Sequence, residues 1–558
     1  MKARLLAVVG LLAALAAPLI LRPQQAIEVR SQLVVVDVTV TDGHGRPVTD
    51  LKRSDFQVFE NDKSQRIVAF QPHAFKPHAP EPETAQEAPA QSPKGVFSNI
   101  DARSRSPSVP ALNIILFDQL NSSFESQKFG RQELIKFLKS LPPGQPTALF
   151  ELRESLRVMT SFSTDSSRLV AAAEKLVPYR SGWFVSEDEA EREVARGATI
   201  STMGRGMPPP PDTGALLNRI RSRGLGERLR ITLRAFRSLA NAVAGYPGRK
   251  NLLWLSEAFP VRFSPEGTVA RPNVMASSTA ARLASLQVAV YPIDTQGLAG
   301  MENQASTLGS VALGKGPAPV AHLLAAKQQW LWQSQTAMDT IAEDTGGRAF
   351  SNSSDLQGAF NHVFDAGANY YTLAYAPTDQ NWNGEFRRIK VTVRREGLHL
   401  AYRKGYYATQ WSPSPAQAEQ KFLKAMYPGI PEATMLAFKT VVKPAGTDTH
   451  ELIVGYYVSG EDVAFQNTKD GRKLAQIKFA AIAYTRNGKP SSVASHLVTL
   501  RLKPKEFGKV LQSGIFFRQP IQFRRGDDRL CVGVLDKQTG SFGTLDVPME
   551  SLDIEHKR

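Results

Sequence analysis

Ile114-Ile115-Leu116-Phe117-Asp118 decides the fold of the central part of this chain. Four consecutive apolar residues that end at a polar one are typical of a short strand with both faces covered. The next segment carries Leu134, Phe137, Leu138 and Leu141 at the spacing of an amphipathic helix. We therefore expect a buried strand that ends at Asp118, followed by a helix that packs on the sheet.

The alternation of strands and helices continues after this first pair. Further strands are expected at 147–152, 156–160, 251–255, 288–293 and 348–350. Amphipathic helices are expected between them, including one at 330–342, and a last helix at about 356–364 follows the final strand. Helices of this length between strands specify right-handed crossovers and a mainly parallel sheet. The sequence thus predicts a central, doubly wound, Rossmann-like α/β domain at 111–410, with a surface insertion at about 179–226.

The chain of 558 residues is long enough for several domains. Alternating apolar residues and turn clusters predict a small β module at 27–75, and a stretch rich in Pro, Ala, Glu and Ser predicts a linker at 76–110. A β-sandwich-like domain is predicted at 411–558 by six candidate strands, near 435–442, 451–458, 476–484, 496–502, 510–517 and 529–535. The expected class is multidomain α/β plus all-β.

The first residues have the pattern of an export signal. Lys2 and Arg4 precede an apolar run that contains Ala14-Leu15-Ala16, a site of the kind that signal peptidase reads. The run continues to about residue 21, so an uncleaved anchor at 1–26 is the alternative to cleavage. We expect an exported protein that is periplasmic, at the cell surface or secreted. Its single cysteine, Cys531, lies in an apolar run and is expected to be a buried structural thiol.

The net charge of +16 favours an acidic partner, such as an anionic polymer or surface. Seven arginines at the end of the expected insertion and in the following helix are candidates for anion binding: Arg219, Arg221, Arg223, Arg228, Arg230, Arg234 and Arg237. The alternative is a solvated face, which is the usual role of such a run. No nucleic-acid partner is expected, because no aromatic-basic motif accompanies the charge. Membrane contact is expected only through an uncleaved N-terminal segment.

Asp118 is the candidate binding residue, because ligands of doubly wound sheets bind at the carboxyl ends of strands. The loop Asp118-Gln119-Leu120-Asn121-Ser122 resembles the metal-ion-dependent adhesion site of von Willebrand A domains, which reads Asp-x-Ser-x-Ser. Ser256-Glu257-Ala258 takes the place of the family's later Thr-Asp-Gly, and Thr232 lies in a segment similar to the one that supplies the family's threonine ligand. The resemblance implies oxygen ligands for Mg²⁺ or Ca²⁺.

The order of motifs over about residues 27–407 resembles the von Willebrand factor A-related domain proteins known chiefly from Acidobacteria. The motifs are Asp42-Gly43-His44-Gly45-Arg46-Pro47-Val48, Asp55-Phe56-Gln57-Val58-Phe59-Glu60, Asp118, Gly248-Arg249-Lys250, Thr345-Gly346-Gly347-Arg348, Tyr370-Tyr371-Thr372-Leu373-Ala374-Tyr375 and Lys404-Gly405-Tyr406-Tyr407. This resemblance implies a secreted or envelope protein, and it says more about the fold than about the function.

The adhesion-site loop departs from the family pattern, because Leu120 replaces a serine ligand and Glu257 is longer than aspartate. One hypothesis is weak binding of Mg²⁺ or Ca²⁺ by the remaining oxygen-bearing residues, Asp118, Ser122 and Glu257, together with Thr232 and Asn121. The other hypothesis is a degenerate site, in which Asp118 and Ser122 cap the next helix and hold the loop.

No sequence motif for catalysis has the context that it needs, so we expect a binding protein and not an enzyme. The run from Gly309 to Gly316 imitates a phosphate loop, but Gly316 stands where a Ser or Thr is required and Pro317 blocks the expected helix. The expected function is an exported protein-interaction or adhesion module of the cell envelope, with a protein or an envelope polymer as partner. The alternatives are an enzyme or enzyme subunit acting on envelope polymers, and a structural envelope component without a ligand.

Overall fold

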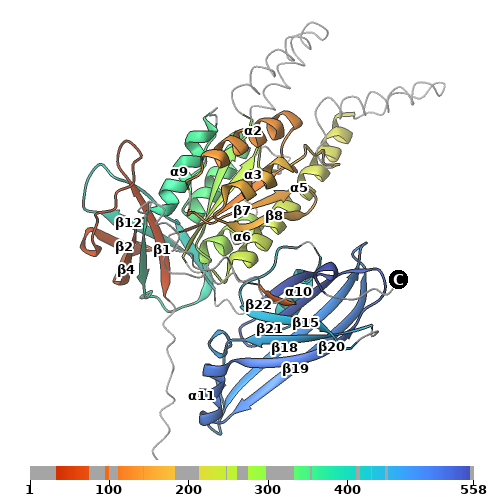
Figure 1. Ribbon diagram of the computed structural model, residues 1–558. Helices are drawn as coiled ribbons and strands as arrows, with labels where there is room; N and C mark the ends of the chain where they lie inside the picture. The colour runs from red at the N-terminus through yellow and green to blue at the C-terminus, as the bar shows by residue number, and fades with distance from the viewer. Residues whose placement is uncertain are drawn as a thin grey trace, which may run out of the picture.

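The computed structural model has three parts (Figure 1): an N-terminal β module, a central α/β domain and a C-terminal β-sandwich. It describes residues 33–74, 95–99, 111–142, 144–182, 213–246, 248–260, 274–296, 332–351, 355–409, 415–428, 430–446 and 450–552. The predicted export signal at 1–26, and most of the predicted linker and insertion, lie outside these residues. Within the described ranges, no helix has the length and apolar character needed to span a membrane.

The central domain is built on a five-stranded sheet in the order β10-β9-β6-β7-β8. Its strands are β6 (Ala111–Asp118), β7 (Thr147–Leu152), β8 (Leu156–Ser163), β9 (Arg249–Ser256) and β10 (Val288–Asp294). All neighbours are parallel except β7 and β8, which form an antiparallel hairpin at the edge. The chain first builds outward from β6 through β7 to β8 and then returns to place β9 on the other side of β6. The order therefore reverses between β6 and β9, which is the point where doubly wound sheets bind ligands.

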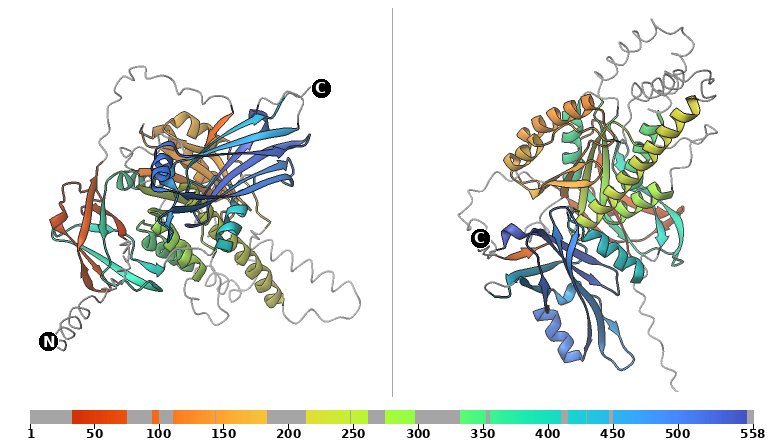
Figure 2. Two further views of the ribbon diagram at one scale, coloured as in Figure 1. Left: turned by 90° about the horizontal axis from the view of Figure 1, so that it is seen from below. Right: turned by 90° about the vertical axis from the view of Figure 1, so that its right-hand side faces the viewer.

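Helices cover both faces of this sheet (Figure 2). On one face lie α2 (Phe124–Ser140), α3 (Ser166–Glu174) and α9 (Leu356–Ala368), and on the other lie α5 (Thr213–Val243), α6 (Val274–Ser285) and a helix at 332–345. The apolar side chains of β6, β7, β9 and β10 face two separate apolar cores, one on each side of the sheet, which explains the continuous apolar runs in the sequence. The mixed α/β class is thus as predicted. Two details differ: α5 begins inside the predicted insertion, and the strand expected at 348–350 is reduced to one bridge between Phe350 and Ile293.

The N-terminal β module is assembled from two distant parts of the chain. The first part supplies β1 (Val34–Thr41), β2 (Phe56–Glu60), β3 (Lys63–Gln65) and β4 (Ile67–His73), and the second supplies β11 (Tyr370–Tyr375), β12 (Asn383–Val393), β13 (His399–Ala401) and β14 (Gly405–Thr409). They form two sheets, β13-β1-β11-β4 and β14-β12-β2-β3, around one core. This corrects the predicted boundaries, in which residues 27–75 formed the β module by themselves and β11 to β14 belonged to the α/β domain at 111–410. Alternation identifies a strand, but it does not identify the partner strand.

The C-terminal part is a sandwich of two antiparallel sheets, β20-β16-β15-β5 and β17-β18-β21-β22, with β19 paired to β18. Its elements are α10 (Pro415–Ala425), β15 (Phe438–Pro444), β16 (Glu451–Val458), β17 (Gln466–Asn467), β18 (Lys473–Thr485), β19 (Pro490–Leu502), α11 (Pro504–Ser513), β20 (Ile515–Gln522), β21 (Asp527–Asp536) and β22 (Phe542–Pro548). Side chains from both sheets share one core. Cys531 is buried in β21, and burial raises the pKa of its thiol.

Two expectations for this region are corrected by the structure. The segment 510–517 was expected to be one strand, but its first half ends the amphipathic helix α11 and only its second half enters β20. The predicted linker contains a strand, β5 (Val96–Ser98), which extends the sheet by pairing with β15. The next residue, Asn99, is buried and its amide donates to the carbonyls of Ala433 and Leu436, both at 2.9 Å. A three-residue strand is too short to show a period in the sequence.

Candidate functional site

Asp118 lies at the carboxyl end of β6, next to the end of β9, and it is almost completely buried. Its Oδ2 accepts hydrogen bonds from Asn121 Nδ2 at 2.8 Å, Trp254 Nε1 at 2.9 Å and Ser256 Oγ at 3.0 Å. Its Oδ1 accepts from the backbone N–H of Asn121 at 3.0 Å. Burial raises the pKa of this carboxyl group, and the four donors act in the opposite direction. Asp118 is therefore the centre of a buried polar network.

The loop after Asp118 is fastened to the end of β9 by two reciprocal contacts. Ser122 Oγ donates to the Asp118 carbonyl at 2.6 Å and accepts from the Glu257 N–H at 3.1 Å. The Glu257 carboxylate accepts from the Ser123 N–H at 2.7 Å. Ser123, and not Asp118 or Ser122, is the N-cap of α2, because its Oγ accepts from the N–H of Ser126. The predicted capping role is thus wrong in its residues, while the predicted holding of the loop agrees with the contacts of Ser122.

Thr232 joins the same network from α5. Its Oγ1 accepts from Asn121 Nδ2 at 2.9 Å, so the Asn121 amide bridges Thr232 and Asp118. The remaining amide oxygen, Asn121 Oδ1, is buried and has no hydrogen-bond donor among the residues that the structure describes. All five predicted ligand residues, Asp118, Asn121, Ser122, Thr232 and Glu257, therefore lie together.

The five residues fit a divalent cation poorly. Donor hydrogens already point at both Asp118 oxygens and at Thr232 Oγ1, whereas a cation needs free oxygen lone pairs. Leu120, which replaces a serine ligand, is fully buried in the apolar core. In the described parts of the chain, no group of three or more His, Cys, Asp or Glu side chains could hold a metal ion. Binding of Mg²⁺ or Ca²⁺ stays a prediction. The oxygen that supports it is the buried Asn121 Oδ1, which accepts no hydrogen bond from the described residues.

Arg228 is the site residue whose role sequence reasoning missed. It precedes Thr232 by one helical turn on α5 and is buried, with 6% of its surface exposed. Burial lowers the pKa of its guanidinium to about 10, while the negative charges of Asp118 and Glu257 raise it. The guanidinium is therefore charged at neutral pH and acts on both carboxylates. The available signal was its spacing of four residues from Thr232, which places both on one face of the helix.

The other arginines of the basic run have a different environment. Arg230, Arg234 and Arg237 are exposed, and Arg230 forms an ion pair with Glu227. The side chains of Arg219, Arg221 and Arg223 lie outside the described residues. Anion binding and its alternative, a solvated face, both need exposed side chains, so neither prediction holds for the buried Arg228. A helix of this length turns part of such a run toward the sheet.

Gln127 holds the neighbouring loops in place. Its Nε2 donates to the carbonyls of Ser122 at 2.9 Å and Tyr179 at 2.8 Å, and its Oε1 accepts from the Tyr179 N–H at 2.8 Å. Next to this fixed loop, Phe124 at the start of α2 is 46% exposed and Val177 is 62% exposed. We name the surface formed by Phe124, Val177, Tyr179 and Glu257 the carboxyl-edge face. Sequence reasoning missed its apolar members, because exposure follows from loop packing.

The motif Gly248-Arg249-Lys250 lies at the opposite end of β9. Arg249 is buried and donates to Tyr291 Oη and the Gly346 carbonyl, both at 2.9 Å, and to Asn251 Oδ1 at 3.2 Å. Its backbone N–H donates to Tyr370 Oη at 3.3 Å. The motifs that contain Arg249, Gly346 and Tyr370 thus contact one another where the α/β domain joins the β module. Their contacts indicate a structural role for these motifs at this junction.

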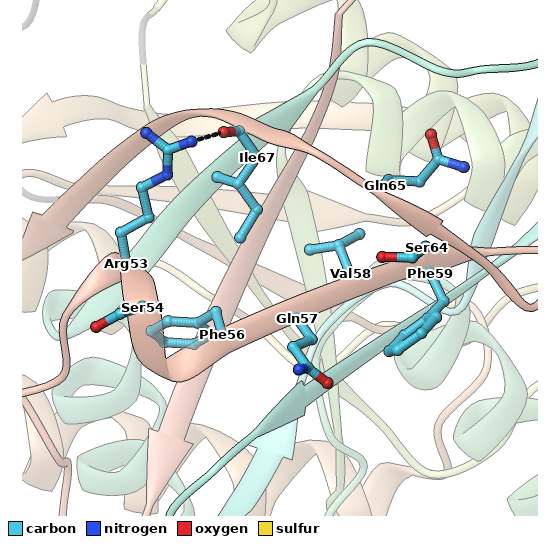
Figure 3. Close-up of a pocket in the computed structure, with 9 residues that line it drawn as sticks. All are labelled: Arg53, Ser54, Phe56, Gln57, Val58, Phe59, Ser64, Gln65 and Ile67. Atoms are coloured by element: carbon cyan, nitrogen blue, oxygen red, sulfur yellow. Dashed lines mark hydrogen bonds between the residues drawn. The ribbon is translucent and has the colours of Figure 1, made fainter.

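A separate hollow of about 710 Å³ opens on the β module (Figure 3). Its lining includes the side chains of Arg53, Phe56, Phe59 and Ser64, and the guanidinium of Arg53 donates to the carbonyl of Ile67. The residues that line it include neither a carboxylate nor a histidine, so they offer no acid/base pair.

No family model matches this chain, and no curated protein matches it. Among solved structures, proximal thread matrix protein 1 from the mussel byssus has 12% identity and a TM-score of 0.23, and covers 46% of this chain. The hypothetical protein BatB from Bacteroides thetaiotaomicron has 7% identity, a TM-score of 0.17 and 33% coverage. A von Willebrand factor type A protein from Catenulispora acidiphila has 8% identity, a TM-score of 0.15 and 78% coverage.

The chain covers 48%, 65% and 65% of those three proteins, respectively. The similarities are all low. The resemblance to von Willebrand A domains accordingly rests on the sequence motifs of this chain.

Proposed function

We propose that this chain is an exported protein-interaction or adhesion module of the cell envelope, which binds its partner at the carboxyl-edge face. One observation carries the proposal. Two exposed apolar side chains flank the loop that follows β6: Phe124 begins α2, and Val177 is joined to the loop through its carbonyl, which accepts from Gln119 Nε2. This loop starts at the switch point of the sheet, where ligands of this fold class bind. Aromatic side chains, Phe included, are enriched at the cores of protein interfaces.

The network beneath the face supports binding without rearrangement. The contacts of Ser122, Glu257 and Gln127 hold the loop through hydrogen bonds of 3.1 Å or less. A surface that is ordered before its partner arrives loses less entropy on association.

The test is affinity capture from envelope extract with the full chain. Phe124→Glu places a charge in the proposed anchor position, and we expect it to abolish capture of a partner that the unchanged chain retains. Phe516→Glu is the matched control, because Phe516 is 71% exposed on the distant β-sandwich. Equal capture by both variants would contradict the proposal, and turnover of an envelope polymer by the purified protein would favour the enzyme alternative instead.

A further inference from the structure

The charges at the carboxyl-edge face are balanced by the protein itself. Asp118 and Glu257 bring two carboxylates to the ends of β6 and β9, and a buried carboxylate without a counter-charge is costly. The guanidinium of Arg228 is buried, and the negative charges of Asp118 and Glu257 raise its pKa. The site therefore holds a cation that is covalently part of the chain.

The geometry of α5 explains how this cation reaches the site. Thr232 contacts Asn121 at 2.9 Å, which fixes the face of the helix that looks toward the Asp118 loop. Arg228 lies four residues earlier on the same face, one turn nearer to the amino end of the helix. Its neighbour Leu229 is buried in the core beside Leu120, so the helix cannot turn Arg228 toward solvent without exposing apolar surface.

We infer that the guanidinium of Arg228 is the built-in counter-charge of this face and stands in for the divalent cation that the Asp118 loop would otherwise hold. Three observations agree with this assignment. Three donors point at Asp118 Oδ2 and a fourth points at Oδ1, Leu120 removes a hydroxyl ligand, and Arg228 is buried on the helix face that carries Thr232. The inference deepens the proposed function, and its test needs no partner, so the two can fail separately.

Titration of the full chain with Mn²⁺, followed by the electron paramagnetic resonance of the free ion, tests the inference. We expect no saturable binding by the unchanged chain. Arg228→Met removes the charge at similar volume, and we expect it to create a site of one ion per chain. Compared with any weak, unsaturable association with the unchanged chain, the new site should bind Mn²⁺ at least about tenfold more tightly. This is about 1.4 kcal/mol, and removing a nearby unit charge changes the energy of a divalent ion by at least that much. Adding Asp118→Asn to this variant should abolish the new site.

Two variants control for other effects. Arg230→Met removes an exposed charge from the same helix and should leave the titration unchanged, as should Arg228→Lys, which keeps the charge. If Arg228→Met does not fold, Arg228→Gln takes its place, because its amide can still form hydrogen bonds. Saturable Mn²⁺ binding by the unchanged chain would overturn the inference, and so would a folded, uncharged variant at position 228 that binds no Mn²⁺.

Discussion

Replacing Asp118 by alanine should destabilise the α/β domain through its buried donors. The substitution removes the acceptor of Trp254 Nε1 and of the Asn121 N–H, while Ser256 Oγ keeps a second acceptor in the Ala258 carbonyl. Each buried donor left unpaired costs about 1–3 kcal/mol. Loss of the desolvation cost of the carboxylate offsets part of this, so we expect a net decrease of about 3 kcal/mol in the free energy of unfolding.

Hydrogen–deuterium exchange measures this effect locally, which matters because the three parts of the chain need not unfold together. Peptides from β6 and β9 should exchange about a hundredfold faster in Asp118→Ala, while those from β18 and β21 should not change. Asp528→Ala is the control, because the Asp528 side chain is 42% exposed and its contact with Arg486 is long, at 3.7 Å. Unchanged exchange in β6 and β9 would refute the view that Asp118 holds this end of the sheet.

Two further predictions concern the junction and the sandwich. Arg249→Met should lower the free energy of unfolding by about 2–4 kcal/mol, because Tyr291 Oη and the Gly346 carbonyl lose a charged donor; calorimetry would contradict this if the variant melted like Arg230→Met. Burial raises the pKa of Glu432 from 4.5 to about 7, so the native state binds more protons in this range and stability should fall as the pH rises through it. Glu432→Gln should remove this dependence and raise the free energy of unfolding by up to about 3 kcal/mol above neutral pH. The assignment would be wrong if the free energies of unfolding in urea changed with pH in the same way for the variant and the unchanged chain.

Local sequence patterns predicted the strands and helices whose formation depends on the burial of their own residues. The apolar runs that became β6, β9 and β10 are buried on both faces, and a strand with two covered faces has no polar positions that could obscure it. The position of Asp118 at a strand end also placed the candidate site, because topology brings the carboxyl ends of parallel strands to one edge. The proximity of Asp118 to Glu257 followed from the same rule, whereas Thr232 lies on α5 and was predicted from the family resemblance alone.

Features that depend on distant partners could not be predicted in this way. The strand β1 pairs with β11, more than 300 residues later, and nothing in the alternation of either strand names the other. Arg228 was assigned to an exposed run, because charged residues are rarely buried unless a partner is present, and its partners are the carboxylates of other elements. Exposure of Phe124 and Val177 similarly follows from how the loops pack.

The central claim is that the carboxyl-edge face binds a partner and is held by an internal network that needs no divalent cation. The direct test is the affinity of the unchanged chain for its captured partner, measured by calorimetry in chelator and again in excess Mg²⁺. We predict the same dissociation constant in both, with binding lost in Phe124→Glu. Binding that requires Mg²⁺, or binding that Phe124→Glu leaves intact, would contradict the claim.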